Sequence, residues 1–141
     1  MQVLLLSSLF IFTHLFPAET NPEDAILGTW VNEEQTTHIE IYKEEGMYFG
    51  KIVWLPMTTD PNGNPITDRN NPDSELRERP LLGINILENF EYKNGEWKEG
   101  TIYSPKNGRK ANPTLELASD DELIIKRKRG VFRRSTTWTR L

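Results

Sequence analysis

Short apolar or alternating segments, separated by Gly, Pro, Asn and Asp, follow one another from Ile26 to the C-terminal residue, and no other feature constrains the fold as strongly. Their spacing is typical of an antiparallel all-β protein. We expect eight strands, over Ile26–Val31, Thr37–Lys43, Tyr48–Leu55, Leu81–Phe90, Trp97–Tyr103, Thr114–Ala118, Glu122–Arg127 and Phe132–Leu141. Eight strands are enough to close a small antiparallel β-barrel, which is the fold that we predict.

Turn-forming residues between these segments support antiparallel connections. Glu45-Gly46 separates the second segment from the third, and Asn94-Gly95 precedes Trp97. Asn107-Gly108 follows the fifth segment. Asn-Gly pairs are the strongest short signal for a β-hairpin, so the segments on either side of them are expected to pair.

The alternation within the segments assigns side chains to faces of the sheet. Ile39 and Ile41 alternate with polar neighbours and are expected to point inward. In the next segment Tyr48, Ile52 and Trp54 lie an even number of residues apart, so we expect them on a common face.

The stretch from Pro56 to Pro80 does not match a strand pattern. A connection this long in a compact domain is usually functional or partly structured, and we expect it to cross one mouth of the barrel. Asn71 is a good N-cap and a proline follows it, so we predict one short helix over Pro72–Glu78 within this loop. Two pairs spaced four residues apart on this helix are expected to form ion pairs: Asp73 with Arg77, and Glu75 with Arg79.

Residues Val3–Phe16 are almost all apolar, and an acidic, polar stretch begins at Glu19. The run is shorter than the about 20 residues of a spanning helix but matches the core of a secretory signal. We therefore predict a signal peptide over residues 1–18 and a single domain over 19–141, without a transmembrane segment in the mature protein. The expected location is periplasmic or secreted. The alternative is that the apolar run is a buried strand or helix.

Composition excludes several function classes. The 141 residues include no cysteine, so there is no thiol nucleophile, thiolate zinc site or disulfide. The formal net charge is −4, which argues against nucleic-acid binding as the main role. We expect no metal and no cofactor.

Catalytic patterns are weak. His38 is the only histidine outside the predicted signal, and no serine elbow accompanies it, so neither a catalytic triad nor a multi-histidine metal site is expected. Asp60-Pro61-Asn62-Gly63-Asn64 is followed by Pro65 at the position where a calcium loop requires glycine, and no glutamate closes the twelfth position, so we interpret the segment as a turn. Acidic residues are plentiful, but no spacing singles out an acid and a base. We predict that the protein is not an enzyme.

Several fragments, in this order and spacing, resemble the family of domains of unknown function 2147 (DUF2147). They are Gly28–Trp30, His38–Tyr42, Gly50–Leu55, Asn71–Asp73, Leu76–Gly83, Gly95–Trp97, Gly100–Pro105 and Phe132–Arg140. The resemblance implies a small exported bacterial protein with a lipocalin-like barrel, whose biochemical role is not established. Two departures are the segment Gly108–Pro113, which lacks an aromatic residue at Ala111, and Arg133, which stands in place of a glycine.

The early Gly-x-Trp and the late arginine also resemble lipocalins, in which an arginine of the last strand covers an indole of the first. A cation over an indole face contributes about 0.5 to 2 kcal/mol, depending on burial. The resemblance implies that Trp30 and Arg140 close the floor of the barrel, a structural role.

Candidate ligand-binding residues lie on the strands. Tyr48, Trp54 and Tyr103 are expected to supply apolar walls with polar tips. Arg134 shares a face with Trp138, so both are expected to point inward, and a buried guanidinium must bind an anion or pair with a carboxylate such as Glu40 or Glu116. We predict a noncatalytic protein that binds a small amphipathic or apolar ligand in the barrel. The alternative is an envelope module that contacts another protein or has a structural role.

Overall fold

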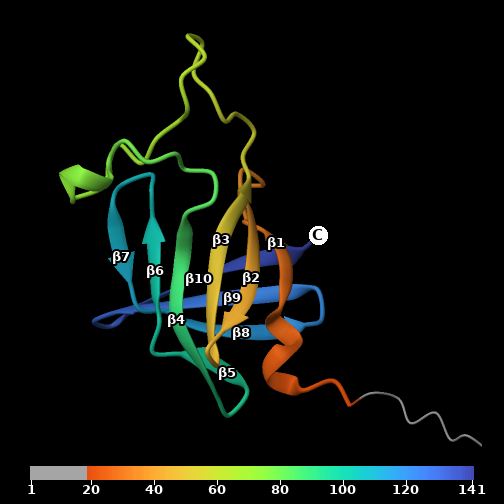
Figure 1. Cartoon of the computed structure of the whole chain (residues 1–141). Helices are drawn as coiled ribbons and strands as arrows, with labels where there is room; N and C mark the ends of the chain where they lie inside the picture. The colour runs from red at the N-terminus through yellow and green to blue at the C-terminus, as the bar shows by residue number, and fades with distance from the viewer. Residues whose placement is uncertain (1–18) are drawn as a thin grey trace, which may run out of the picture.

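The computed structural model describes residues 19–141, so the predicted signal peptide lies outside the described residues. The described chain forms ten short strands and two 3-10 helices (Figure 1). The helices are η1 (Pro22–Ile26) and η2 (Ser74–Leu76). The strands are β1 (Gly28–Val31), β2 (His38–Glu44), β3 (Met47–Trp54), β4 (Asn85–Lys93), β5 (Glu96–Lys98), β6 (Thr101–Ser104), β7 (Arg109–Ala111), β8 (Thr114–Ser119), β9 (Glu122–Arg129) and β10 (Phe132–Arg140). Neither helix is long and apolar enough to cross a membrane.

The strands form one antiparallel sheet that closes into a barrel. Their order is β3-β2-β1-β10-β9-β8-β5-β4-β6-β7, and a further pairing of β3 with β4 completes the ring. β5 and β6 both pair with β4 and are two halves of one bent strand. β7 pairs with β6 and β8 pairs with β5, so β7 and β8 are the two halves of the neighbouring bent strand. The predicted all-β barrel of about eight strands is therefore confirmed.

The two bent strands are interrupted at a glycine and at a proline. Gly100 separates β5 from β6, and a Cβ at this position would collide with the ring of Phe90, so a side chain cannot be accommodated without movement. Asn112 and the buried Pro113 separate β7 from β8, because proline has no N–H to continue the ladder.

The predicted segments match the observed strands with local differences. Ile26 belongs to η1 rather than to the first strand, and β4 begins at Asn85 rather than Leu81. β7 was not predicted. The Glu45-Gly46 and Asn94-Gly95 turns do join β2 to β3 and β4 to β5, and all four residues have positive φ angles, as tight hairpin turns require.

Ile39 and Ile41 point into the core as predicted, and so do Tyr48 and Ile52. The common face predicted for Trp54 is wrong, because its side chain is 42% exposed. Between β2 and β3 the register shifts by one residue, so that Ile39 opposes Ile52 while His38 opposes Trp54. One extra residue in β3 reverses the alternation beyond it and places Trp54 on the outer wall.

The helix predicted over Pro72–Glu78 is a single 3-10 turn confined to Ser74–Leu76. Its N-cap is Asp73, whose side chain accepts from the N–H of Glu75. Neither predicted ion pair is found among the described residues. The guanidinium groups have other acceptors: Arg77 Nε donates to the carbonyl oxygen of Asn71, and Arg79 binds a carboxylate described below.

Candidate functional site

One end of the barrel is closed by η1 and an indole. Trp30 is fully buried, and its Nε1 donates to the carbonyl oxygen of Ile26 at 2.8 Å. Arg140 covers the other side, with its Cζ 4.2 Å from the centroid of the Trp30 rings. Its guanidinium also donates to the carbonyl oxygens of Leu27 and Ala25, each at 2.7 Å. Backbone carbonyl groups of residues 25–27, just before β1, therefore hold both side chains.

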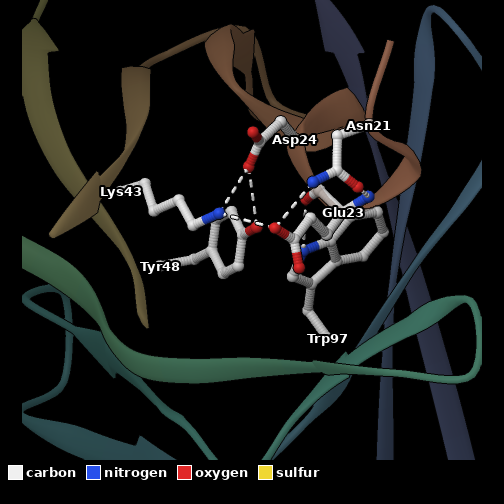
Figure 2. A network of polar contacts seen from close by, with 6 residues as sticks. All are labelled: Asn21, Glu23, Asp24, Lys43, Tyr48 and Trp97. Carbon is white, nitrogen blue, oxygen red and sulfur yellow. Dashed lines mark hydrogen bonds and ion pairs between the residues drawn. The ribbon is translucent and has the colours of Figure 1, made fainter. Parts of the chain in front are cut away.

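A second polar network joins η1 to the strands at the same end (Figure 2). The hydroxyl of Tyr48 donates to Asp24 at 2.9 Å, and Lys43 Nζ lies 2.8 Å from Glu23 and 3.0 Å from Asp24. Trp97 Nε1 donates to the carbonyl oxygen of Glu23. Burial, with the bond to Asp24, raises the pKa of Tyr48 to about 12. The hydroxyl that we expected in a ligand pocket thus anchors η1.

The opposite end of the barrel contains a cavity of about 840 Å³. Its rim comes from the β1–β2 loop, the loop after β3, the β6–β7 turn and the distal parts of β9 and β10. The floor is formed by the core residues Ile39, Ile52, Ile86, Ile102, Tyr103 and Trp138. The arrangement is an apolar bottom under a polar, charged rim.

The structure brings three of the five expected ligand residues to this cavity: Tyr103, Arg134 and Trp138. Tyr48 and Trp54 are not among its lining residues. Tyr48 lies at the closed end, and Trp54 stacks on His38 outside the barrel, with ring centroids 4.4 Å apart.

Arg134 lies at the rim and is exposed rather than buried. Its partner across the ladder is Arg127, which also lines the cavity, and neither guanidinium forms an ion pair within residues 19–141. The carboxylates considered as partners for Arg134 are paired elsewhere, Glu40 with Lys51 and Glu116 with Lys126. Two adjacent cations therefore line the cavity without an ion pair to a described carboxylate, although Glu33, Glu34 and Asp60 line the same cavity.

A buried carboxylate ties the long loop to this end of the barrel. Asp68 is fully buried, and its Oδ1 accepts from the hydroxyl of Tyr103 at 2.6 Å. Its Oδ2 accepts from Arg79 at 2.9 Å and from the side-chain amide of Asn71 at 2.8 Å. Burial, with the bond to Asp68, raises the pKa of Tyr103 to about 12. Sequence reasoning missed Asp68, because no local pattern connects it with Arg79 or with Tyr103, which lie 11 and 35 positions away in the chain.

The loop is also fixed against the β6–β7 turn. Asn70 donates from its side chain to the carbonyl oxygens of Pro105 and Lys106, at 3.1 and 3.0 Å. Gly108 has a positive φ, and a Cβ there would collide with the backbone oxygen of Asn70. Only glycine allows this close approach, so the Asn107-Gly108 turn helps to build the rim.

The other residues considered for catalysis or metal binding, His38 and Asp60, lie in separate parts of the structure. His38 is on the outer wall, as noted above. Asp60 accepts from the backbone N–H groups of Asn62 and Asn64, which lower the pKa of its carboxyl group. Among residues 19–141, no three His, Asp or Glu side chains gather into a group that could hold a metal ion.

Comparison with known proteins agrees with this architecture. A family model described as an uncharacterized protein conserved in bacteria, DUF2147, matches residues 28–140. The chain belongs to the DUF2147 family. A solved structure titled "Protein HP1028 from the human pathogen Helicobacter pylori belongs to the lipocalin family" is similar to this DUF2147 chain, with a TM-score of 0.69 and 19% identity over 82% of each chain. The likeness shows a lipocalin-like fold. No curated protein matches.

Proposed function

We propose that the protein is a noncatalytic binding protein that holds one small amphipathic molecule in the cavity at the open end of the barrel. The observation that carries the proposal is an apolar floor beneath two arginines that form no ion pair within the described residues. The volume of about 840 Å³ lies within the range of about 300 to 1,000 Å³ common for small-molecule sites.

The floor supplies the driving force. Ile39, Ile102 and Trp138 each present part of a buried side chain to the cavity. An apolar ligand segment placed against them leaves water, which contributes about 0.8 kcal/mol for each buried methylene group.

The rim supplies orientation. Arg134 and Arg127 are directly opposite each other on neighbouring strands, and like charges in this position destabilise a sheet. An acidic group of the ligand relieves that repulsion and forms charge-assisted hydrogen bonds. Thr136 lines the cavity one step further in on the same face of β10. The ligand therefore enters with its apolar part first.

Native mass spectrometry of gently purified protein tests the proposal. We expect one copurified small molecule per chain, or, after its removal, saturable one-to-one binding of the anionic fluorophore anilinonaphthalene sulfonate. Arg134→Gln should weaken binding roughly ten- to hundredfold, because a charge-assisted bond is worth about 1.5 to 3 kcal/mol. Arg133→Gln is the matched control, since Arg133 lies on the other face of β10 and does not line the cavity.

Three outcomes would contradict the proposal. One is the absence of both a copurified molecule and saturable binding. Another is equal binding by the Arg134 and Arg133 variants. Copurification of a stoichiometric protein partner in place of a small molecule would instead favour an envelope interaction module.

We also propose that the protein is exported and acts in the periplasm or outside the cell. The support is the apolar run Val3–Phe16 followed by a polar stretch. N-terminal sequencing of protein from its natural compartment tests this, and the mature chain should begin between Phe16 and Asn21. Retention of Met1 would contradict export.

A further inference from the structure

The hairpin of β9 and β10 extends beyond the rest of the sheet (Figure 1). β8 pairs with β9 only as far as Lys126, and β1 pairs with β10 only at Thr139 and Arg140. Within the described residues, the distal segment 127–134 therefore pairs only with itself. Such a two-stranded ribbon has both edges and both faces accessible.

Charge is strongly concentrated in this ribbon. The nine positions 126–134 contain six of the 17 Lys and Arg residues of the chain and none of its 21 Asp and Glu residues. Lys126 pairs with Glu116, but the other five cations form no ion pair within residues 19–141. Lys128 opposes Arg133 on the outer face just as Arg127 opposes Arg134 on the inner one. Both pairs repel, so the ribbon is suited to an anionic partner.

The tip of the hairpin is apolar. Val131 is 92% exposed and Phe132 is 77% exposed, the two highest values among the large exposed hydrophobic side chains of the described chain. They follow the turn residue Gly130 and are flanked by Arg129 and Arg133. Apolar side chains at an exposed tip with cations directly behind them match a bilayer surface, where hydrocarbon lies beneath anionic headgroups.

We propose that the β9–β10 hairpin docks the open end of the barrel onto an anionic lipid surface. Val131 and Phe132 insert among the lipids, while Lys128, Arg129 and Arg133 lie against the headgroup phosphates. Since the rest of the chain is acidic, an anionic surface repels it and selects the hairpin-first orientation. This orientation brings the arginines of the cavity rim close to the membrane.

Vesicle cosedimentation tests the proposal. The full described chain, 19–141, is mixed with vesicles of phosphatidylcholine alone or with added phosphatidylglycerol, at low and at physiological salt. Binding should require phosphatidylglycerol and weaken with salt, because screening shortens the reach of the cations.

Two variants separate charge from insertion, and neither changes a residue that lines the cavity. Lys128→Gln with Arg133→Gln should weaken vesicle binding about 25-fold, since each cation near an anionic surface contributes a factor of about five. Val131→Ser with Phe132→Ser should weaken it at least about tenfold through lost apolar burial. Lys93→Gln with Lys98→Gln is the control, because these two lysines lie on the β4–β5 hairpin beside glutamates and should leave binding unchanged. Thermal melting checks that each variant is folded.

Several results would overturn the proposal. The first is no binding to phosphatidylglycerol vesicles at low salt, and the second is binding that both hairpin variants retain. Loss of binding in the charge variant but not in the tip variant would exclude insertion. Sedimentation without vesicles, abolished by the tip variant, would mean that the tip contacts a second copy of the chain instead. The fluorophore titration is separate, so failure here leaves the cavity proposal standing.

Discussion

The two ends of this barrel both combine aromatic and charged side chains, but at one end two arginines form no ion pair within residues 19–141. At the closed end Arg140 covers Trp30 and binds backbone oxygens, and Lys43 lies between two carboxylates. At the open end Arg127 and Arg134 oppose each other on neighbouring strands, line the cavity and form no ion pair within the described chain. On this difference rests our proposal that the closed end serves stability and the open end serves binding.

Asp68 is an exception to this contrast between the two ends. It lies at the open end, yet it is fully buried and accepts from Tyr103, Arg79 and Asn71. A satisfied polar network of this kind holds a loop in one position. The network therefore fixes the loop after β3 at the rim of the cavity.

The largest expected effect is at the closed end. Trp30→Ala should lower the free energy of unfolding by about 3 to 5 kcal/mol, the usual range for removal of a buried large aromatic side chain. It also removes the surface on which Arg140 packs and the bond to Ile26. Urea unfolding measures the loss, and a change below about 1 kcal/mol would show that Trp30 is not part of a packed floor.

The next effect is at the loop anchor. Asp68→Asn places an NH₂ group where three donors require acceptors, so it should cost about 1.5 to 3 kcal/mol of stability. Hydrogen exchange should increase in the loop more than at the closed end. Asp73→Asn in the same loop is the control, since asparagine and aspartate are equivalent N-caps. Equal effects of the two substitutions would mean that the buried network does not hold the loop.

The dependence of stability on alkaline pH involves one tyrosine from each end of the barrel. The pKa values of Tyr48 and Tyr103 are raised to about 12, while an unfolded tyrosine ionises near about 10. Between these values the folded state binds more protons than the unfolded state, so the free energy of unfolding falls as pH rises. The contribution is complete below about pH 10 and is lost as pH rises through about 12.

Ultraviolet absorbance of tyrosinate measures this titration. Tyr48→Phe and Tyr103→Phe should each remove one late step from the titration of the folded protein. Ionisation of both tyrosines near pH 10 in the folded protein would contradict the burial of their hydroxyl groups.

The smallest effect is expected on the outer wall. Trp54→Ala removes a half-exposed ring that stacks on His38, so it should cost about 1 kcal/mol or less. It should leave fluorophore affinity unchanged, because Trp54 does not line the cavity. Weaker binding by this variant would show that the ligand contacts the outside of β3.

The barrel was predictable because its signals are local. Alternation located the strands, and Asn-Gly located a hairpin at Asn94-Gly95. The face of Trp54 was not predictable, because an extra residue in β3 is recognised only from the register with β2. β7 is three residues long and follows a turn, so it carries almost no periodic signal.

The cavity was only partly predictable. The phase of β10 indicated that Arg134 and Trp138 share a face, and both line the cavity. The contribution of Arg127 depends on the pairing of β9 with β10, and that of Asp68 depends on contacts with residues far away in sequence. Such contacts arise from tertiary packing, which a single sequence does not display.

A paired measurement of stability and ligand affinity in two variants tests the central claim most directly. Arg134→Gln should lose roughly ten- to hundredfold in fluorophore affinity and change stability by less than about 0.5 kcal/mol. Trp30→Phe should lose more than about 1 kcal/mol of stability, through the missing N–H bond to Ile26, and keep its affinity. If Arg134→Gln instead lowered stability while leaving affinity intact, the division into a stabilising closed end and a binding open end would be contradicted.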